Sequence, residues 1–413
     1  MRYTFYRPTH EPMSCVYNEV FAEGFFTMII GVPKEIMSGE DRVAATPETV
    51  ADMVGKGLTV LVETGAGEGS FFHDPEYVSA GAEMVSDPEE IYQRADLILK
   101  VKEPLFNEAK GRSEVSMMHK GQYLITFIHP AAPPNHEMVK EMATQGVISL
   151  TLDGVPRISR AQNLDALTSM STCAGYKGIL LAANYQPSFM PLIHSAIGRI
   201  DPLKVLVVGV GVGGLQALAT AKRLGAVVHA ADIRPMASEQ ATSLGAKPVE
   251  LGVDPEKAIG EGGYAQALPE DELVKERAAL AKVVPDMDII FASALVPGHL
   301  APRLITEDMV KSMKPGSVIV DISIDQGGNC EITPPGKVEV KHHVTLVGIK
   351  NIPGMLPKSS TFMFAKNIAN FVDFLVKDGQ IVLDRSDEII AKTLTTIDGE
   401  IVHVGAREAM GLA

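Results

Sequence analysis

Residues 205–232 read VLVVGVGVGGLQALATAKRLGAVVHAAD and contain an apolar strand, a glycine turn, a helix and a second strand that ends in an acid. The glycine spacing is typical of a dinucleotide-binding unit. Gly209 allows the tight turn, Gly211 lets backbone N–H groups approach a diphosphate, and Gly214 lets the helix pack closely on its strand. The helix begins at this turn, so its free N–H groups and positive dipole end face the ligand. The segment predicts a site for an adenine dinucleotide.

The acid at the end of the second strand bears on which dinucleotide binds. Asp232 follows the glycines by about 20 residues, where a carboxylate accepts hydrogen bonds from the adenosine ribose. Its charge favours NAD over NADP, whose 2′-phosphate is an anion. Arg234 argues the other way, because a guanidinium pairs well with a phosphate. The pattern as a whole indicates NAD(H).

Length and charge limit the remaining possibilities. At 413 residues the chain is too long for one ordinary hydrophobic core, so we expect two domains. A net charge of −14 argues against nucleic acid or an anionic membrane surface as a partner. The three cysteines share no metal-ligand spacing, so we expect free thiols and no metal site. They are Cys15, Cys173 and Cys330.

Apolar strands alternate with helices in the N-terminal third of the chain. The strands are expected at 28–32, 58–63, 97–101, 122–128 and 146–152, and the helices at about 46–56, 74–80, 88–94 and 136–145. Such alternation predicts parallel βαβ units. We therefore expect a second α/β domain before the glycine turn.

The rest of the chain predicts the other domain and a return to the first. A helix at 169–183 crosses between them, strands follow at 205–210, 227–232, 288–292, 317–322 and 344–348, and a helix at 362–376 leads to polar hairpins at 382–390 and 394–404. The uncharged stretch 178–198 contains two prolines and polar residues, so we expect a buried helix and loop there and no membrane span.

These segments predict an α/β fold with two Rossmann-like domains, parallel sheets and an NAD site in the cleft between them. The expected divisions are a poorly ordered extension over 1–27, a domain over 28–168 that 355–413 completes, and an NAD(H)-binding domain over 169–354. Met28 directly precedes the first strand and is a plausible alternative start of the chain.

Residues 156–165, PRISRAQNLD, carry more functional side chains than packing requires. On the residues alone, a solvated turn before a helix explains the segment as well as a site does. A hydride-transfer site needs amide-like partners for a carboxamide and groups that order a ring in a cleft. Gln162 and Asp165 are three residues apart and would share a helical face.

Several motifs together resemble one family. They are RISRAQNLD at 157–165, the glycine turn, ADIR at 231–234, Gly-Gly-Tyr at 262–264, and MKPGSVIVD with GGNC between 313 and 330. From about Met28 to the C-terminus the chain is similar to the NAD(H)-binding domain I of proton-translocating NAD(P) transhydrogenases, within the wider family that includes alanine dehydrogenase. Thr168 stands where the transhydrogenase pattern usually has serine.

The resemblance implies that the chain binds NAD(H) and passes a hydride to NADP+ on a partner subunit, while a membrane subunit couples the exchange to proton translocation. It implies that Arg157, Gln162 and Asp165 position the nicotinamide, and that a loop bearing Tyr264 closes over the nucleotide. A homodimer in the cytoplasm, held at the inner membrane through its partner subunits, is expected. The residues expected to bind the cofactor are Arg157, Ile158, Ser159, Arg160, Gln162, Gly209, Gly211, Val212, Gly214, Asp232, Ile233, Arg234, Gly263, Tyr264 and Leu295.

An NAD-dependent amino-acid dehydrogenase, acting on alanine or a related 2-keto acid, is the alternative. The chain has the residue types of the alanine dehydrogenase site, in which Arg42 and Lys102 would hold the keto acid while His129 and Asp325 handle the proton. Each also has a structural explanation, such as ion pairs with the acids that flank Arg42 and Lys102. The RISRAQNLD segment favours the transhydrogenase, because alanine dehydrogenases have a proline-rich segment there.

Overall fold

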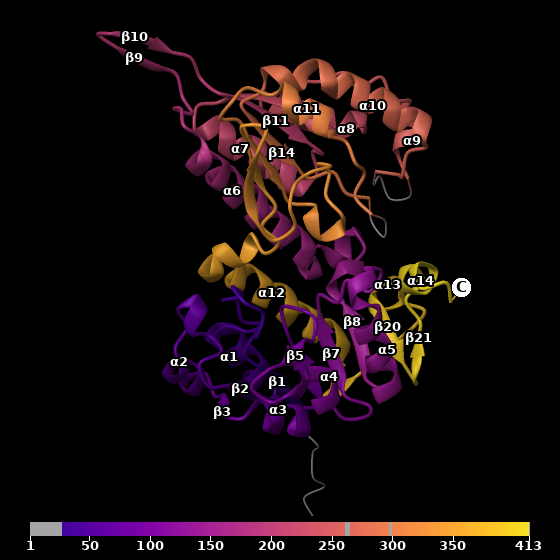
Figure 1. Ribbon diagram of the computed structural model, residues 1–413. Helices are drawn as coiled ribbons and strands as arrows, with labels where there is room; N and C mark the ends of the chain where they lie inside the picture. Colours follow the sequence, from indigo (N-terminus) through magenta and orange to yellow (C-terminus); the bar gives the residue numbers. More distant parts are fainter. Residues whose placement is uncertain (1–26, 261–264, 297–299, 413) are drawn as a thin grey trace, which may run out of the picture.

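The structure is a computed structural model that describes residues 27–260, 265–296 and 300–412. Two lobes, each built on one sheet, lie one above the other in Figure 1. Most neighbouring strands in both sheets are parallel, so the expected α/β class is confirmed. The extension expected over 1–27 lies, apart from Thr27, outside the described residues.

The first lobe has an eight-stranded sheet in the order β21-β20-β8-β7-β4-β1-β2-β3. Strands β1 to β8 of this sheet run parallel, and β20 pairs with β8 in the antiparallel direction. The strands are β1 Ile29–Val32, β2 Thr59–Glu63, β3 Glu83–Val85, β4 Leu97–Leu99, β7 Tyr123–Thr126, β8 Ile148–Thr151, β20 Leu394–Ile397 and β21 Glu400–Ile401. The helices between them are α1 Pro47–Gly55, α2 Asp74–Ser79, α3 Pro88–Arg94, α4 Glu114–Met117 and α5 His136–Gln145.

The second lobe has a seven-stranded sheet in the order β13-β12-β11-β14-β15-β17-β16. The strand order reverses between β11 and β14, which are parallel neighbours, and ligands bind outside the carboxyl ends of strands at such a switch point. The strands are β11 Lys204–Val208, β12 Val227–Ala231, β13 Lys247–Pro248, β14 Ile289–Ala292, β15 Val318–Asp321, β16 Val338–Lys341 and β17 Val344–Val347. The helices are α7 Val212–Arg223, α8 Pro235–Ser243, α9 Pro255–Ala258, α10 Glu270–Val283 and α11 Glu307–Ser312.

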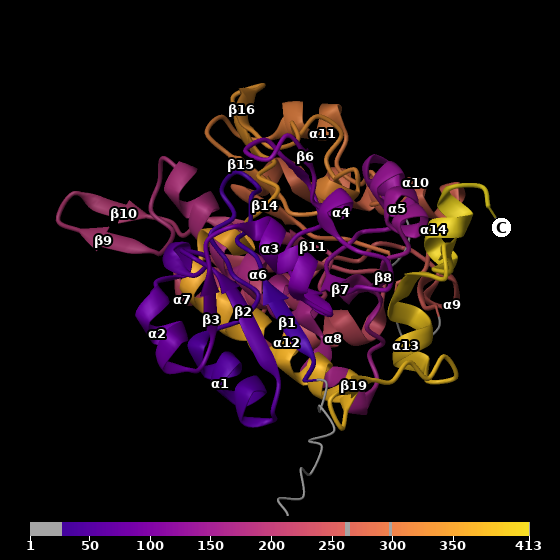
Figure 2. The same ribbon diagram turned by 90° about the horizontal axis from the view of Figure 1, so that it is seen from below.

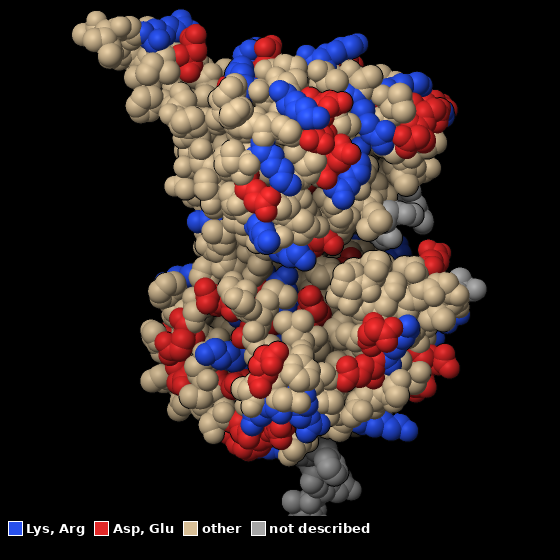
Figure 3. Space-filling model, in the orientation of Figure 1, with Lys and Arg blue, Asp and Glu red and all other residues tan. Residues whose placement is uncertain are grey.

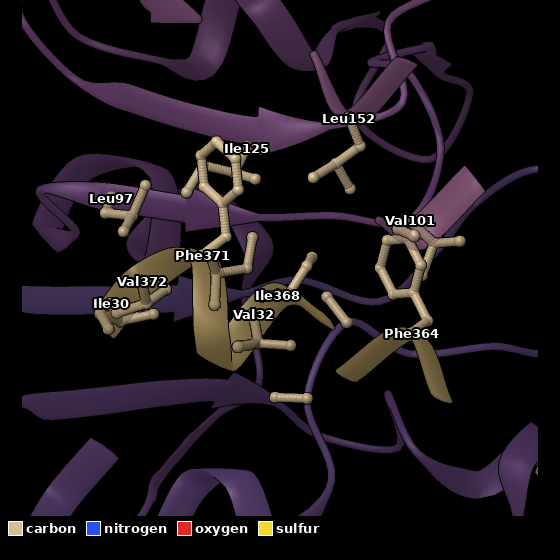
Figure 4. Packing of buried hydrophobic residues seen from close by; sticks show 14 of the residues in the cluster. Ile30, Val32, Leu97, Val101, Ile125, Leu152, Phe364, Ile368, Phe371 and Val372 are labelled. Atoms are coloured by element: carbon tan, nitrogen blue, oxygen red, sulfur yellow. The ribbon is translucent and has the colours of Figure 1, made fainter. Parts of the chain in front are cut away.

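Two long helices connect the lobes. The first half of α6, Ala166–Tyr185, contributes Met170 and Cys173 to the first core, and its second half contributes Ile179 and Ala182 to the second core. The return helix α12, Pro357–Leu375, packs on the first sheet. Figure 4 shows its buried residues facing the first sheet. The labelled side chains are Phe364, Ile368, Phe371 and Val372 from α12, Ile30, Val32, Leu97 and Ile125 from the strands, and Val101 and Leu152 from the segments that follow β4 and β8.

Two local expectations are wrong. The segment 382–390 forms no hairpin, because Asp387 caps a helix, α13 Glu388–Thr393, by accepting a hydrogen bond from the backbone N–H of Ile389. The stretch 178–198 is not a buried helix and loop throughout. Its helical part is buried as far as Ala182 and Met190 is buried in the loop, but an exposed hairpin of β9 Ile193–Ser195 and β10 Gly198–Ile200 projects from the second lobe in both views (Figures 1 and 2). Within the described ranges, no helix has both the length and the apolar character needed to cross a bilayer.

Candidate active site

The glycine turn between β11 and α7 has the geometry that its sequence predicts. Gly209 has a φ of +85°, and a Cβ there would collide with the backbone of Ala294 on the neighbouring strand loop. A Cβ on Gly214 would collide with the carbonyl oxygen of Gly209, so the helix approaches the turn closely. A Cβ on Gly211 would meet no atom within 4 Å. The first turn of α7 therefore opens onto free space at the carboxyl end of β11.

Asp232, directly after β12, is held in place by its neighbours. Its Oδ2 accepts a hydrogen bond from the backbone N–H of Val210 at 2.7 Å, which ties the acid to the glycine turn. Arg234 binds the same carboxylate through Nε and a terminal nitrogen, at 3.0 and 2.8 Å. Asp232 and Arg234 thus form one neutral ion pair. The pair as a whole neither repels nor attracts the 2′-phosphate of NADP. Ile233 between them is half-buried.

The loops after β14 and β15 form the other wall of the switch point. The side chain of Asn329, fully buried, binds both the N–H and the carbonyl oxygen of Ala294, next to the predicted Leu295. Asp321 at the end of β15 accepts a hydrogen bond from the N–H of Cys330. Asn329 therefore sets the course of the backbone that faces the glycine turn.

The segment 157–165 leads directly into α6. A short 3-10 helix, Ser159–Leu164, buries Ala161 and Leu164 and leaves Gln162 exposed, without a hydrogen bond in the described structure. Asp165 caps α6 by accepting hydrogen bonds from the N–H of Thr168 at 2.8 Å and its Oγ1 at 2.6 Å. Thr168 thus provides the hydroxyl that a serine would.

Arg160 is engaged on the first lobe. Its guanidinium binds both oxygens of Asp387 at 2.8 and 2.9 Å, which links the segment to the start of α13. Arg157, Ile158 and Ser159 lie toward the surface, with Ile158 half-buried. Gln162 is therefore one of the exposed polar side chains of the segment, with Ser159 and Asn163.

Close packing of α6 on α7 joins the glycine turn to the helix into which this segment leads. A Cβ on Gly175 of α6 would collide with the carbonyl oxygen of Gly213 in α7, and a Cβ on Gly213 would lie 3.2 Å from the carbonyl oxygen of Ser171. The first turn of α7 therefore lies against the middle of α6, around Ser171 and Gly175, with Val212 half-buried at the start of α7. Figure 3 shows a hollow between the lobes on one face of the molecule, with acidic and basic side chains interspersed around it.

The residues of the alternative keto-acid site are engaged in other contacts. Arg42 is buried, and its guanidinium binds both oxygens of Glu40 at 2.7 and 2.6 Å and the side-chain oxygen of Asn351 at 2.9 Å. Burial alone would raise the pKa of Glu40, but the hydrogen bonds and charge of Arg42 outweigh it and lower that pKa. A keto-acid carboxylate would have to displace Glu40 from Arg42. The cluster links a loop of the first lobe to one that follows β17.

His129 pairs with Asp153 and not with Asp325. Its Nδ1 lies 2.7 Å from Oδ1 of Asp153, and its backbone, at a φ of 49°, donates to Oδ2 of the same residue. Burial acts to raise the pKa of Asp153, but the charge and hydrogen bonds of His129 lower it to about 2. Asp325 is 3.7 Å from Nζ of Lys350. Lys102 is half-buried on the loop after β4.

The structure adds site residues that the sequence analysis missed, and it leaves two predictions untested. Asp153, Asn329 and Asn351 carry polar networks around the cleft. Asn329 stands in the GGNC motif, which is a signal in the sequence, whereas Asp153 and Asn351 have no local signal. The predicted Gly263 and Tyr264 lie outside the described residues. No group of three or more His, Cys, Asp or Glu side chains within the described ranges could hold a metal ion.

Comparison with known proteins agrees with this geometry. Residues 31–174 match the family model described as alanine dehydrogenase/PNT, N-terminal domain, and residues 178–404 match its C-terminal domain. The chain is 42% identical over 379 residues to an NAD(P) transhydrogenase subunit alpha protein of Rhodospirillum rubrum, a match that covers 91% of this chain and 98% of that protein. It is 32% identical over 393 residues to alanine dehydrogenase of Methanococcus maripaludis, a match that covers 93% and 97%.

A solved structure supports the same relationship. The crystal structure of transhydrogenase from Sinorhizobium meliloti superposes with a TM-score of 0.78 at 37% identity and covers 91% of this chain and 100% of that one. The two family models together cover both lobes, and so does this superposition. The chain therefore belongs to the alanine dehydrogenase/PNT family.

Proposed function

We propose that this chain is the NAD(H)-binding subunit of a proton-translocating NAD(P) transhydrogenase and passes a hydride from NADH to NADP+ on a partner subunit. The observation that carries the proposal is the glycine turn that opens onto free space at the carboxyl end of β11, with α6, the helix that follows Gln162 in the chain, packed against α7. Greater identity to the Rhodospirillum protein than to alanine dehydrogenase, 42% against 32%, supports it.

The residues present fit a dinucleotide. The open space at Gly211 leaves the free N–H groups of α7 accessible to a diphosphate, and Asp232 lies where the adenosine ribose would be held. When bound, NADH supplies the hydride from its nicotinamide ring. Transfer between two nicotinamides releases no proton, so the chain needs to orient a ring and exclude water, and it needs no acid or base. The exposed amide of Gln162 suits a carboxamide partner.

The buried ion pair of Arg42 with Glu40 argues against the dehydrogenase alternative, because a keto acid would have to break it. The deciding experiment supplies the purified chain with NADH and an NADP analogue on the NADP-binding partner subunit, and separately with NADH, pyruvate and ammonium. Hydride exchange with the analogue and no keto-acid turnover is the expected outcome. Rapid keto-acid turnover that His129→Ala abolishes would overturn the proposal.

The partner subunits follow from the proposed function. The NADP site and the proton path would lie on other polypeptides, and we propose that these hold the chain at the cytoplasmic face of the inner membrane. Copurification with a multi-span membrane protein that binds NADP(H) is the expected finding. A complex that transfers hydride without any such partner would contradict it.

Asp232→Ala is expected to weaken NADH binding by about 1–3 kcal/mol, through loss of hydrogen bonds to a charged group. The carboxylate also accepts the N–H of Val210, so the loss includes some order in the turn. Titration calorimetry with NADH measures the change. Unchanged affinity would show that the ribose is recognised elsewhere.

We propose a homodimer that involves the projecting hairpin of β9 and β10. Its apolar side chains are uncovered, with Ile197 99% and Ile200 42% exposed, and an isolated two-stranded hairpin is only marginally stable in water. Ile197→Asp together with Ile200→Asp is expected to shift the protein toward the monomer in light scattering. Val340→Asp, at another exposed apolar residue on a strand, is the control. A dimer that both variants retain would contradict the role of the hairpin.

A further inference from the structure

Glu276 is a buried acid that the proposed reaction does not use. It lies on α10 three residues after Leu273 and four before Leu280, on the helix face that enters the core, and it is only 5% exposed. It forms no hydrogen bond or ion pair within the described residues. Its neighbour Arg277 is engaged by Glu270 and by the carbonyl oxygen of Arg303. Partial withdrawal from water without a hydrogen-bond partner disfavours the charged carboxylate, so packing alone gives no reason for an acid at this position.

The face of α10 that carries Glu276 packs near the end of β12. Leu280 belongs to the same buried cluster as Ala231, and Leu273 and Ile233 pack against that cluster. Ala231 and Ile233 flank Asp232 in the chain, so Asp232 and Glu276 lie on elements that border the same buried cluster. Burial, and then the negative charge of Asp232, raise the pKa of Glu276 to about 7, while the charge of Arg277 acts weakly to lower it.

The charge balance at the predicted ribose site depends on this second acid. Asp232 and Arg234 cancel each other, and Arg234 on its own would attract a 2′-phosphate. An ionised Glu276 gives the group of three residues one net negative charge. A protonated Glu276 leaves the group neutral.

We propose that Glu276 is a specificity residue that excludes the 2′-phosphate of NADP(H) from the adenosine end of the site. The inference rests on the proposed function, because it assumes that NADH binds at the glycine turn. It explains why Arg234 beside Asp232 does not make the site accept NADP(H). It also assigns a role in ligand selection to an acid whose burial is otherwise unfavourable.

The test compares NADH and NADPH binding to the wild type and to Glu276→Gln between pH 6 and pH 8.5. The chain contains no tryptophan, so nucleotide fluorescence is read without that background. At pH 8.5, where wild-type Glu276 is ionised, the variant is expected to bind NADPH about tenfold more tightly, the effect of removing one partly screened repulsion, with NADH affinity little changed. At pH 6 wild-type Glu276 is protonated, so the two proteins are expected to converge.

A matched control separates this effect from a general change of charge. Asp271→Asn removes one negative charge from the exposed part of the same helix, where the side chain is 66% exposed, and is expected to leave the NADPH-to-NADH affinity ratio unchanged. An unchanged ratio in Glu276→Gln at pH 8.5, with NADH still bound, would overturn the inference and leave the proposed function intact. A wild-type protein that binds no NADH would overturn the proposed function itself, and this inference with it.

Discussion

Gln162→Ala is expected to slow hydride transfer about 100-fold, because a small misplacement of reacting groups has an effect of that size. The amide is exposed and forms no hydrogen bond in the described structure, whereas Ala161 and Leu164 anchor the segment. The substitution therefore removes a partner for the nicotinamide without disturbing the fold. NADH affinity and thermal stability are expected to stay close to the wild-type values.

Single-turnover kinetics with the NADP-binding partner measures the transfer step, and calorimetry measures NADH binding separately. Asn163→Ala is the matched control, since the adjacent side chain is also exposed while its backbone carbonyl holds the segment to α12. Equal rates in Gln162→Ala and the wild type would refute the positioning role. Equal slowing in both variants would point to the segment and not to the amide.

Lys100→Met is expected to reduce the free energy of unfolding by about 3–5 kcal/mol, the usual effect of removing one partner from a buried ion pair. Lys100 is fully buried, and its Nζ lies 2.9 Å from Glu114 and 3.2 Å from Glu35. Those carboxylates also accept the N–H groups of Leu105 and Val101, so the network orders the loop that carries Lys102. Methionine would leave two buried acids without their cation.

The stability that Lys100→Met loses relative to the wild type is expected to become smaller as the pH falls from 8 toward 5. Burial already raises the pKa of Glu35 against the opposing charge of Lys100, and loss of Lys100 raises it further. Because the folded variant then binds protons more readily than the unfolded chain, acid stabilises it relative to neutral pH. Denaturant unfolding at several pH values measures this. Lys56→Met removes an exposed pair with Asp373 and is expected to change stability by less than about 1 kcal/mol, so similar losses in both variants would contradict the argument.

The periodic segments of the chain were predictable, and the exceptions have local causes. Alternation of apolar strands with helices predicted the longer parallel strands of both sheets, because period-2 and period-3.6 patterns differ over such lengths. The short edge strands β3 and β13 were missed, since two or three residues carry no period. The hairpin predicted over 382–390 is wrong because Asp387 caps a helix there. The helix begins at Glu388 and buries Ile389 and Ile390. The domain limits at 28–168 with 355–413 and at 169–354 stay predictions.

The candidate site was predictable where its residues are close together in the chain. The glycine turn and Asp232 lie within one βαβ unit, so their spacing carries the information. The pair of Arg42 with Asn351 joins distant segments, and only the assembled lobes reveal it. His129 and Asp153 follow the neighbouring parallel strands β7 and β8, but neither stands in a motif, so no pattern in the sequence pairs them. The same holds for Glu276, which on sequence alone is one of many acids on a polar helix.

The helix α6 belongs to both hydrophobic cores, and this affects how the protein unfolds. Its first turns bury Met170 in one lobe and its last turns bury Ala182 in the other, with α7 held against it at Gly175. If either lobe unfolded and α6 unfolded with it, the apolar residues that α6 covers in the other lobe would become exposed to water. We therefore expect the two lobes to unfold in one coupled transition, which a single calorimetric peak would show.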